Sequence, residues 1–437
     1  MPKVEQPLPA GGPKREQFAL DEIEHTTASP FTVRLLLTFF LTTIVAVPAL
    51  ELAVARTSGS ESIAVAWSHL AGISDEIRAY LAKADDANLW DRIVVRNRLV
   101  LAGLSGFERA LENVSTIGRS LRPPAQTLMT RWLGAGNERV YPGHDGWLFY
   151  REDVEYVTGR GFLDEAQMSR RISATPEWTT PPQPDPREAI VRFNMDLASR
   201  GITLIVMPTP VKPGVHPDRL SRRYGQADGV LHNASYRGFV ADLERQGVRV
   251  FDPSEVLTAA RRTAPQYLAA DTHWRPEAME MVAERLGSVI AGVVELPAGP
   301  DPDYRVERME VSNVGDIAAM LDLPDDSPLF PPEAVWVRRI LEMDGRPWRA
   351  TRDADVLLLG DSFSNVYALE SMGWGTSAGF AEQLAYVLRR PIDRIVQNDD
   401  GAFATRELLQ REPARLDGKR VVIYQFAARE LADGDWK

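Results

Sequence analysis

A short unit of helix, glycine and apolar strand recurs along the second half of this chain of 437 residues, and it constrains the fold more than any other feature. Gly201 and Gly247 each follow a stretch with helical periodicity, and each precedes a short apolar run. Five runs of this kind are present: 203–207, 248–251, 356–359, 394–397 and 420–424. Uniformly apolar strands that alternate with helices are typical of parallel sheets with both faces covered. The sequence therefore predicts an α/β fold with a parallel sheet and helices on both faces, in which ligands bind beyond the carboxyl ends of the strands.

An apolar run near the N-terminus indicates a membrane. Residues 35–55 carry a single charge, Glu51. A spanning helix needs about 20 residues, so we expect a transmembrane anchor over residues 31–55, with Glu51 at the membrane interface. The leader before it, residues 1–30, is polar and rich in proline and glycine, and we expect it to be disordered. A buried core helix rarely follows such a leader, which favours the anchor.

Flanking residues bear on how the anchor is processed and oriented. Residues 53–55 (Ala-Val-Ala) resemble a signal-peptidase site, but the 34 residues ahead of the apolar run exceed a normal signal-peptide n-region. We therefore expect an uncleaved anchor. Lys14, Arg15 and Arg34 precede the run and only Arg56 follows it closely, and basic residues gather on the cytoplasmic side of a membrane. The bulk of the chain is therefore expected outside the cytoplasm.

Periodic apolar residues after the anchor predict a helical stalk over residues 60–135. They recur at spacings of three and four between residues 67 and 121. Pro123 and Pro124 are expected to interrupt these helices.

The folded domain is expected to cover residues 140–437. Turn residues and aromatics in residues 140–150 predict a strand and hairpin at its start. Five prolines in residues 175–186 predict an extended loop.

Composition excludes several functions. The formal net charge is −11, and no cluster of Lys and Arg is present, which argues against a nucleic-acid partner. The chain has no cysteine, so a disulfide, a thiol nucleophile and a thiolate metal site are all excluded.

Two short segments supply an acid, a base and a hydroxyl nucleophile. Asp271 and His273 lie two residues apart, and Ser362 follows Gly360 at the end of a predicted strand. A serine hydroxyl is a poor nucleophile unless an imidazole removes its proton, and that imidazole works best when a carboxylate orients it. Glycine permits a sharp turn off the strand, and a helix predicted over residues 365–372 would direct its amide dipoles toward an oxyanion. The residues predict acyl transfer through a Ser–His–Asp triad.

Each segment also has a purely structural interpretation. Asp361, Ser362 or Ser364 could cap the following helix. Pro276 fits the first turn of an amphipathic helix, for which the Asp271 segment would supply ordinary caps. A metal site is disfavoured because only two oxygen and nitrogen ligands occur, with no further histidine cluster. We expect neither a metal nor another cofactor.

The order of these segments resembles a known family. Gly360-Asp361-Ser362 resembles the nucleophile block of SGNH hydrolases, but in most of that superfamily the Asp and His follow the Ser, whereas here they precede it. This permuted order is similar to the alginate O-acetyltransferase family of the AlgJ and AlgX type, which acetylates exported polysaccharides. Three further segments resemble that family, and the match covers about residues 140–431: 146–149 (GWLF), 208–213 (PTPVKP) and 425–431 (QFAAREL).

The resemblance implies a role for each candidate residue. Ser362 would attack an acetyl donor, His273 would accept and return the proton, and Asp271 would orient the imidazole. Asn398 is the candidate for the superfamily's oxyanion asparagine, and Gly360 is a second oxyanion candidate. Asn398 could instead be a turn residue, since it opens an Asn-Asp-Asp-Gly sequence.

Other polar and aromatic residues are candidates for binding a sugar. Arg406 and Arg429 could hold a substrate, or they could pair with carboxylates, and pairing is the safer interpretation. Trp147, Trp274 and Trp374 could stack on sugar rings, but buried packing is the commoner fate of a tryptophan.

The sequence as a whole therefore predicts a membrane-anchored O-acetyltransferase with a polysaccharide acceptor. The resemblance implies an inner-membrane anchor, a periplasmic catalytic domain and a membrane-bound acyltransferase that supplies acetyl groups. Because Lys437 follows the last strand closely, we expect no C-terminal carbohydrate-binding module. Two alternatives stay open: an SGNH esterase that uses the same triad with water as acceptor, and a non-catalytic polysaccharide-binding scaffold.

Overall fold

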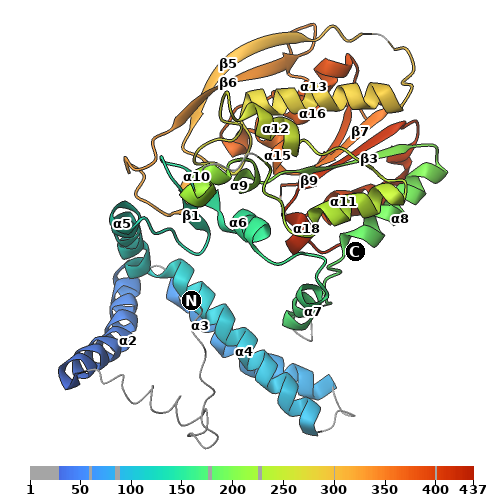
Figure 1. The fold of residues 1–437 in the computed structure, drawn as a ribbon. Helices are drawn as coiled ribbons and strands as arrows, with labels where there is room; N and C mark the ends of the chain where they lie inside the picture. Colours follow the sequence, from blue (N-terminus) through green and yellow to red (C-terminus); the bar gives the residue numbers. More distant parts are fainter. Residues whose placement is uncertain are drawn as a thin grey trace, which may run out of the picture. The chain divides into compact units, whose positions relative to one another are not determined.

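The structure, a computed structural model, describes residues 29–58, 62–83, 89–175, 180–224, 229–299, 301–398 and 401–437. These residues divide into two compact units, Met1–Arg122 and Pro123–Lys437 (Figure 1). The predicted disordered leader, residues 1–30, lies outside the described residues except for its last two.

The first unit contains the apolar helix. Helix α2 (Pro30–Ser58) includes a stretch, Pro30–Glu51, that is long and apolar enough to cross a membrane, with a mean hydropathy of 2.1. Glu51 is buried, and its Oε1 accepts a hydrogen bond from Ser115 Oγ at 2.6 Å. The apolar helix predicted over residues 31–55 is therefore present, and the helix continues to Ser58.

The helices predicted for the stalk are present, but they are interrupted at a different point. They are α3 (Ser62–Lys83), α4 (Leu89–Val114) and α5 (Thr116–Leu133). The predicted break at Pro123 and Pro124 is wrong, because both prolines lie inside α5. The break falls at Ser115, whose Oγ accepts the Gly118 amide at 2.9 Å, as an N-cap does. The fixed φ of proline is a helical value, so the helix can continue through both residues, although each proline removes a backbone hydrogen bond and crowds the carbonyl four residues earlier.

A five-stranded parallel sheet forms the centre of the second unit. Its strand order is β4-β3-β9-β7-β8, and every neighbouring pair is parallel. The strands are β3 (Thr203–Thr209), β4 (Arg249–Val250), β7 (Val356–Gly360), β8 (Asp393–Val396) and β9 (Val421–Ala427). All five apolar runs of the sequence are thus strands of one parallel sheet, which confirms the predicted α/β fold. Because the strands are parallel, their carboxyl ends meet at one edge.

Helices cover both faces of this sheet (Figure 1). Side chains alternate along each strand: Leu358 faces one apolar cluster with α13 and α16, and Leu357 and Leu359 face a second with α8, α11 and α17. The bounds of these helices are α8 (Pro186–Ser199), α11 (Tyr236–Arg245), α13 (Pro276–Val293), α16 (Phe380–Leu388) and α17 (Phe403–Arg411).

Two antiparallel hairpins complete the second unit. Strands β1 (Val140–Pro142) and β2 (Leu148–Tyr150) form the hairpin predicted for residues 140–150. Strands β5 (Arg305–Asn313) and β6 (Glu333–Leu341) form a longer one. The remaining α-helices are α6 (Arg151–Thr158), α7 (Glu165–Ala174), α9 (Lys212–Val215), α10 (Pro217–Leu220), α12 (Ser254–Ala260), α14 (Asp316–Met320), α15 (Ser362–Asn365) and α18 (Glu430–Asp433). Short 3-10 turns are η1 (Arg222–Tyr224), η2 (Glu370–Met372) and η3 (Pro413–Leu416).

The helix predicted over residues 365–372 is wrong. The helix after β7 is α15, which begins at Ser362 and ends at Asn365, and turns follow it. Two buried side chains hold this segment in the core. Tyr367 Oη donates to Trp274 O at 2.6 Å. Trp374 is buried and lies between two glycines with positive φ. A helix of four residues has only a small dipole, so the expected oxyanion stabilisation by a long helix does not apply here.

Candidate active site

The Asp271–His273 segment is held in a closed loop. Tyr267 and Trp274 form an antiparallel β-bridge across it, and the Leu268 amide donates to His273 O at 3.1 Å. Pro276 begins α13 directly after the loop, as the sequence predicts. Both Asp271 and His273 are buried. The loop therefore presents the two side chains from a fixed backbone.

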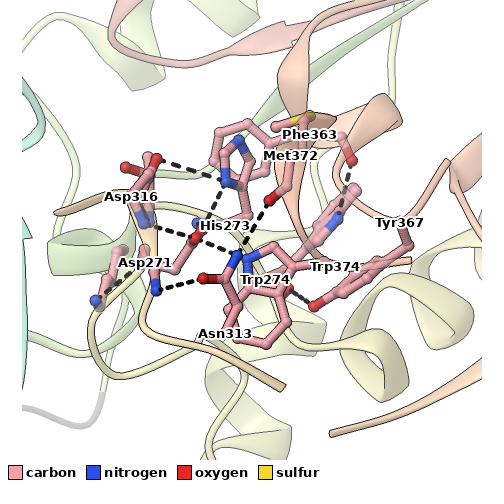
Figure 2. Close-up of polar contacts among 12 residues, drawn as sticks. Asp271, His273, Trp274, Asn313, Asp316, Phe363, Tyr367, Met372 and Trp374 are labelled. Carbon is pink, nitrogen blue, oxygen red and sulfur yellow. Dashed lines mark hydrogen bonds and ion pairs between the residues drawn. The ribbon is translucent and has the colours of Figure 1, made fainter. Parts of the chain in front are cut away.

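Asp271 and His273 form a hydrogen-bonded acid–base pair (Figure 2). His273 Nδ1 donates to Asp271 Oδ1 at 2.7 Å, and the His273 amide donates to the same oxygen at 3.0 Å. Asp271 Oδ2 accepts from the Asp316 amide at 3.0 Å and from Trp374 Nε1 at 2.9 Å. Four accepted hydrogen bonds fix this carboxylate, which in turn fixes the orientation of the imidazole.

Electrostatics poise the pair for proton transfer. Burial alone would raise the pKa of Asp271, but the charge and hydrogen bonds of His273 outweigh it, so the pKa of Asp271 lies below its ordinary value. Burial alone would lower the pKa of His273, but the Asp271 carboxylate outweighs it, so the pKa of His273 is raised. The carboxylate is thus ionised wherever the imidazole titrates, as a general base requires.

Ser362 lies on a tight turn at the carboxyl end of β7. Asp361 caps α15 by accepting the Phe363 amide at 2.9 Å, and Ser362 is the first residue of that helix. A Cβ at Gly360 would lie 2.5 Å from Ser364 Oγ and 2.9 Å from its Cβ. Only glycine therefore fits the last position of the strand, which gives the Gly-Asp-Ser motif a steric reason.

Gln425 on β9 holds the same turn through side-chain hydrogen bonds. Its Oε1 accepts from the Asp361 amide at 3.0 Å and from Ser364 Oγ at 2.6 Å. Its Nε2 donates to Asp361 Oδ1 at 2.7 Å and to Thr209 Oγ1 at 3.0 Å. This buried amide thereby ties the turn to both β9 and β3.

The structure brings the Ser362 turn beside His273. The rings of Phe363 and His273 have centroids 4.9 Å apart, and Trp274 Nε1 donates to Phe363 O at 3.1 Å (Figure 2). His273 Nε2 is buried and has no hydrogen-bond partner among the described residues. Ser362 is partly exposed. The imidazole nitrogen that faces away from Asp271 is therefore available, and the imidazole ring packs against Phe363, the residue that follows the candidate nucleophile.

Asn398 lies next to this turn. It follows the end of β8, and its Oδ1 accepts from Asn365 Nδ2, in the last residue of α15, at 2.9 Å. Its own Nδ2 has a thioether neighbour, Met372 Sδ, at 3.5 Å. Sulfur is a weak acceptor, so the amide nitrogen keeps capacity for a stronger one.

Arg406 is not brought to this group. Arg406 Nε donates to Tyr424 Oη at 3.1 Å and Nη2 to Lys437 O at 2.9 Å, on the face of the sheet covered by α8 and α17. Arg429 pairs with the buried Asp153 at 3.0 Å, as the pairing interpretation expects. These arginines hold the C-terminal segment in place.

The three candidate tryptophans are buried, with relative exposures of 6% for Trp147, 0% for Trp274 and 1% for Trp374. The packing interpretation is therefore the correct one for all three. Trp374 has a further duty, since its indole N–H is one of the donors to Asp271.

Two residues of the site had no role assigned from the sequence: Asp316 was not singled out, and Lys212 was noted only within the segment 208–213. Asp316 Oδ1 accepts the Thr272 amide at 2.7 Å, and Asp316 Oδ2 lies 3.8 Å from His273 Nδ1. Burial and the neighbouring Asp271 raise the pKa of Asp316 to about 6. No motif marks this residue. Its position becomes visible only when β5 is seen to end beside the Asp271 loop (Figure 2).

Lys212 is the second of these residues. Its fully buried ammonium donates to Leu148 O at 2.6 Å, Ala269 O at 2.8 Å and Asp271 O at 3.0 Å. Burial lowers its pKa to about 7, although nearby carboxylates, Asp271 first, oppose that shift. Because Lys212 follows β3 closely in the sequence, its position could have indicated that it lies at this edge of the sheet.

Asp271, His273 and Asp316 also have the composition of a metal site, because their nearest ligand atoms lie within 4.8 Å of one another. The atoms of this group that lie nearest one another, however, are engaged with protein groups: Asp271 accepts four hydrogen bonds, and His273 Nδ1 donates one of them, so that only His273 Nε2, on the far side of the ring, has no partner among the described residues. A metal ion would have to displace these bonds. The arrangement suits proton positioning better than metal binding.

Comparisons with known proteins identify a family for the residues that carry this site. A family model described as "SGNH hydrolase-like domain, acetyltransferase AlgX" matches residues 140–428. A relative from Pseudomonas aeruginosa, named probable alginate O-acetylase AlgJ, is 27% identical over 319 residues, covering 69% of this chain and 74% of the relative. Its counterpart in Pseudomonas syringae pv. tomato is 25% identical, covering 68% and 70%.

A solved structure shares the fold. The O-acetyltransferase domain of Pseudomonas putida AlgJ superposes with a TM-score of 0.50 at 21% identity, covering 67% of this chain and 92% of that domain.

Proposed function

This chain belongs to the family of SGNH hydrolase-like acetyltransferases of the AlgX type, and we propose that it transfers acetyl groups to a polysaccharide through an acetyl-serine at Ser362. Its curated relatives are named as probable alginate O-acetylases, which supports a polysaccharide acceptor. The observation that supports the assignment of residues is the fixed Asp271–His273 pair: its Nε2 has no hydrogen-bond partner among the described residues, and its ring packs against Phe363, next to Ser362 in the chain.

The proposed reaction has two halves. In the first, His273 Nε2 takes the proton of Ser362 Oγ, which attacks the carbonyl carbon of the acetyl donor, and the leaving group departs with that proton. In the second, a sugar hydroxyl gives its proton to His273 Nε2 and attacks the acetyl-serine ester. The bond from the acyl carbon to Ser362 Oγ breaks, and His273 returns that proton to Ser362 Oγ, which regenerates the serine. Asp271 stays ionised throughout and stabilises the imidazolium that forms in each half.

We propose Asn398 as a donor to the oxyanion. Its Oδ1 is occupied by Asn365, which orients the amide, while its Nδ2 has only a sulfur neighbour. A donor that is already oriented when charge develops contributes most to the rate. Gly360 has a different proposed role, which is to give the turn room beside Ser364. Arg406 is not proposed as a substrate ligand, because its hydrogen bonds go to Tyr424 and Lys437.

We further propose that α2 anchors the chain in an inner membrane, with the catalytic unit in the periplasm. The length and hydropathy of Pro30–Glu51 support the anchor. A membrane-bound acyltransferase would then be the source of acetyl groups. The domain limits proposed from the sequence, an anchor over residues 31–55, a helical stalk over 60–135 and a catalytic domain over 140–437, follow the same scheme.

The test uses the full-length chain in detergent with a chromogenic acetyl ester, with and without polysaccharide. The wild type is compared with Ser362→Ala and with Ser288→Ala, a control at an exposed serine of α13. We expect acetate release or transfer in the wild type and the control and its loss in Ser362→Ala. Mass spectrometry should find the trapped acetyl group on the peptide that contains Ser362. Equal activity in Ser362→Ala would refute the assignment, and release to water regardless of acceptor would favour an esterase.

A further inference from the structure

Helix α5 (Thr116–Leu133) buries polar side chains and exposes apolar ones, which is the reverse of an ordinary surface helix. Its buried side chains Gln126 and Thr130 are polar, and they satisfy each other: Gln126 Nε2 donates to Thr130 Oγ1 at 2.9 Å. Thr130 Oγ1 in turn donates to Ala135 O at 3.0 Å. A helix at the surface of a soluble domain normally buries its apolar stripe and exposes its polar one. The buried face of α5 is formed by these polar side chains, so packing against the domain does not account for the apolar residues of this helix.

Those apolar residues form one exposed stripe. Leu121, Leu128 and Trp132 follow one another at spacings of seven and four, which places them on one side of a helix. Their relative exposures are 63%, 61% and 74%. Met129 and Leu133, at 42% and 73%, widen the stripe. Single exposed apolar residues are ordinary, but a contiguous stripe indicates a binding surface.

The charges of α5 indicate what the stripe contacts. The helix has 18 residues without a single Asp or Glu, in a chain whose net charge is −11. Its charged residues are Arg119, Arg122 and Arg131. The Arg131 guanidinium lies 6.0 Å from the ring centroid of Trp132. Arg122 and Arg131 lie on the two flanks of the stripe, whereas Arg119, seven residues before Gln126, lies on the side of the buried polar residues. Arginines that border a stripe containing Trp and Leu are typical of helices that lie in the surface of an anionic membrane.

We propose that α5 lies in the surface of an anionic bilayer. The stripe formed by Leu121, Leu128 and Trp132 enters the boundary between headgroups and acyl chains, and Arg131, which lies beside Trp132, contacts phospholipid phosphates. The inference rests on the proposed anchoring by α2 and goes beyond the proposed function. Such a contact would give the chain a second membrane attachment, directly before the catalytic domain.

The test measures how deeply single positions lie in the bilayer. Because the natural chain has no cysteine, one introduced cysteine can be labelled with an environment-sensitive fluorophore without any background. Full-length Leu128→Cys and Trp132→Cys are reconstituted into nanodiscs of phosphatidylcholine with phosphatidylglycerol, containing lipids that carry a shallow nitroxide quencher. Met195→Cys, an equally exposed apolar position on α8 at 65%, is the matched control. Phe40→Cys in α2 reports on the anchor with a deep quencher.

The inference requires strong quenching at Leu128 and Trp132 and none at Met195. It also requires weaker quenching of the Leu128 probe when Arg131→Glu is added or when phosphatidylglycerol is left out. Leu128 and Trp132 probes that stay as accessible to water as Met195 would overturn it. Probes that are protected from water but not quenched would also overturn it, because a protein would then cover the stripe. Quenching at Phe40 alone would leave the anchor intact and reject the α5 contact. Ester hydrolysis by the same samples reports separately on the proposed function.

Discussion

Replacing Asp316 by asparagine tests whether this second carboxylate beside His273 sets the pKa of the proposed base. Asp316 Oδ2 lies 3.8 Å from His273 Nδ1, while Oδ1 accepts the Thr272 amide. Asparagine keeps the shape of the side chain and an oxygen acceptor for Thr272, and it removes only the charge. Asp344→Asn is the matched control, since Asp344 pairs with Arg346 at an exposed turn.

The expected shift follows from the distance. Two unit charges about 4 Å apart interact by about 4 kcal/mol at an effective dielectric constant near 20, equivalent to a ceiling of roughly 3 pKa units. Two features of Asp316 reduce this value. A third of its side chain, 34%, is exposed, and its own pKa of about 6 leaves it partly protonated where His273 titrates. We therefore expect the pKa of His273 to fall by about one unit in Asp316→Asn.

The direction of the effect on rate is fixed by the role of the base. His273 must be neutral to accept a proton, so kcat/KM falls at pH values below its pKa. Negative charge from Asp271 and Asp316 raises that pKa. Removing one charge lowers it, and the acid limb of the kcat/KM profile should move to lower pH by about the same unit. The assay is ester hydrolysis across the acid range by the wild type, Asp316→Asn and Asp344→Asn. An unmoved limb in Asp316→Asn would refute the reasoning.

Stability should change in the opposite sense to most active-site substitutions. The pKa of Asp316 is raised in the folded chain, from 3.8 to about 6, because burial and Asp271 disfavour its charged form. Ionised Asp316 therefore costs stability as pH rises through that interval. Allowing for its exposed third, Asp316→Asn should be more stable by about 1–2 kcal/mol at neutral pH and indistinguishable from wild type below the unfolded pKa. Urea denaturation at both pH values measures this difference.

Three further substitutions test the supports of the site. Gly360→Ala should abolish ester hydrolysis and lower the free energy of unfolding by about 1–3 kcal/mol, because its Cβ would overlap the Ser364 side chain. Its control is Gly238→Ala, at a helical position with open space. This variant should keep its activity and be slightly stabilised in the same assays. Gln425→Glu replaces the amide donor to Asp361 with a carboxylate oxygen that cannot donate, so the turn loses a hydrogen bond and kcat for ester hydrolysis should fall. Lys212→Met leaves buried carbonyls without their charged donor, so the free energy of unfolding should fall by roughly 1–3 kcal/mol and kcat should fall more than KM changes.

The sheet and the Asp271–His273 pair could be predicted because their signals are local. Each apolar run is uniformly hydrophobic, since each strand faces an apolar cluster on both sides, and this pattern is written in consecutive residues. Parallel strands place their ends at one edge, so the motif with Ser362 and the segment with Asn398 were expected there. The Asp271–His273 hydrogen bond joins residues two apart, which sequence spacing alone can indicate.

The supports could not be predicted because they depend on contacts between distant segments. Lys212 reaches Leu148, which is 64 residues earlier in the chain, and Trp374 reaches Asp271 across 103 residues. The predicted helix over residues 365–372 failed for a related reason: burial of Tyr367 and Trp374 overrides local helical preference. The prolines of α5 were misinterpreted because the cap that interrupts the helices, at Ser115, is a side-chain hydrogen bond.

The contacts that hold Asp271 determine how the Asp271–His273 pair responds to substitutions around it. Asp271 receives hydrogen bonds from two segments besides its own, and its backbone carbonyl is held by a third, through Lys212. A carboxylate fixed from several sides cannot follow a shifted imidazole, so a displacement of any one segment weakens the Asp271–His273 bond before it disturbs the fold. Substitutions at Trp374 or Lys212 should therefore lower kcat first. The residues proposed to carry out the chemistry depend for their function on the residues that only hold them.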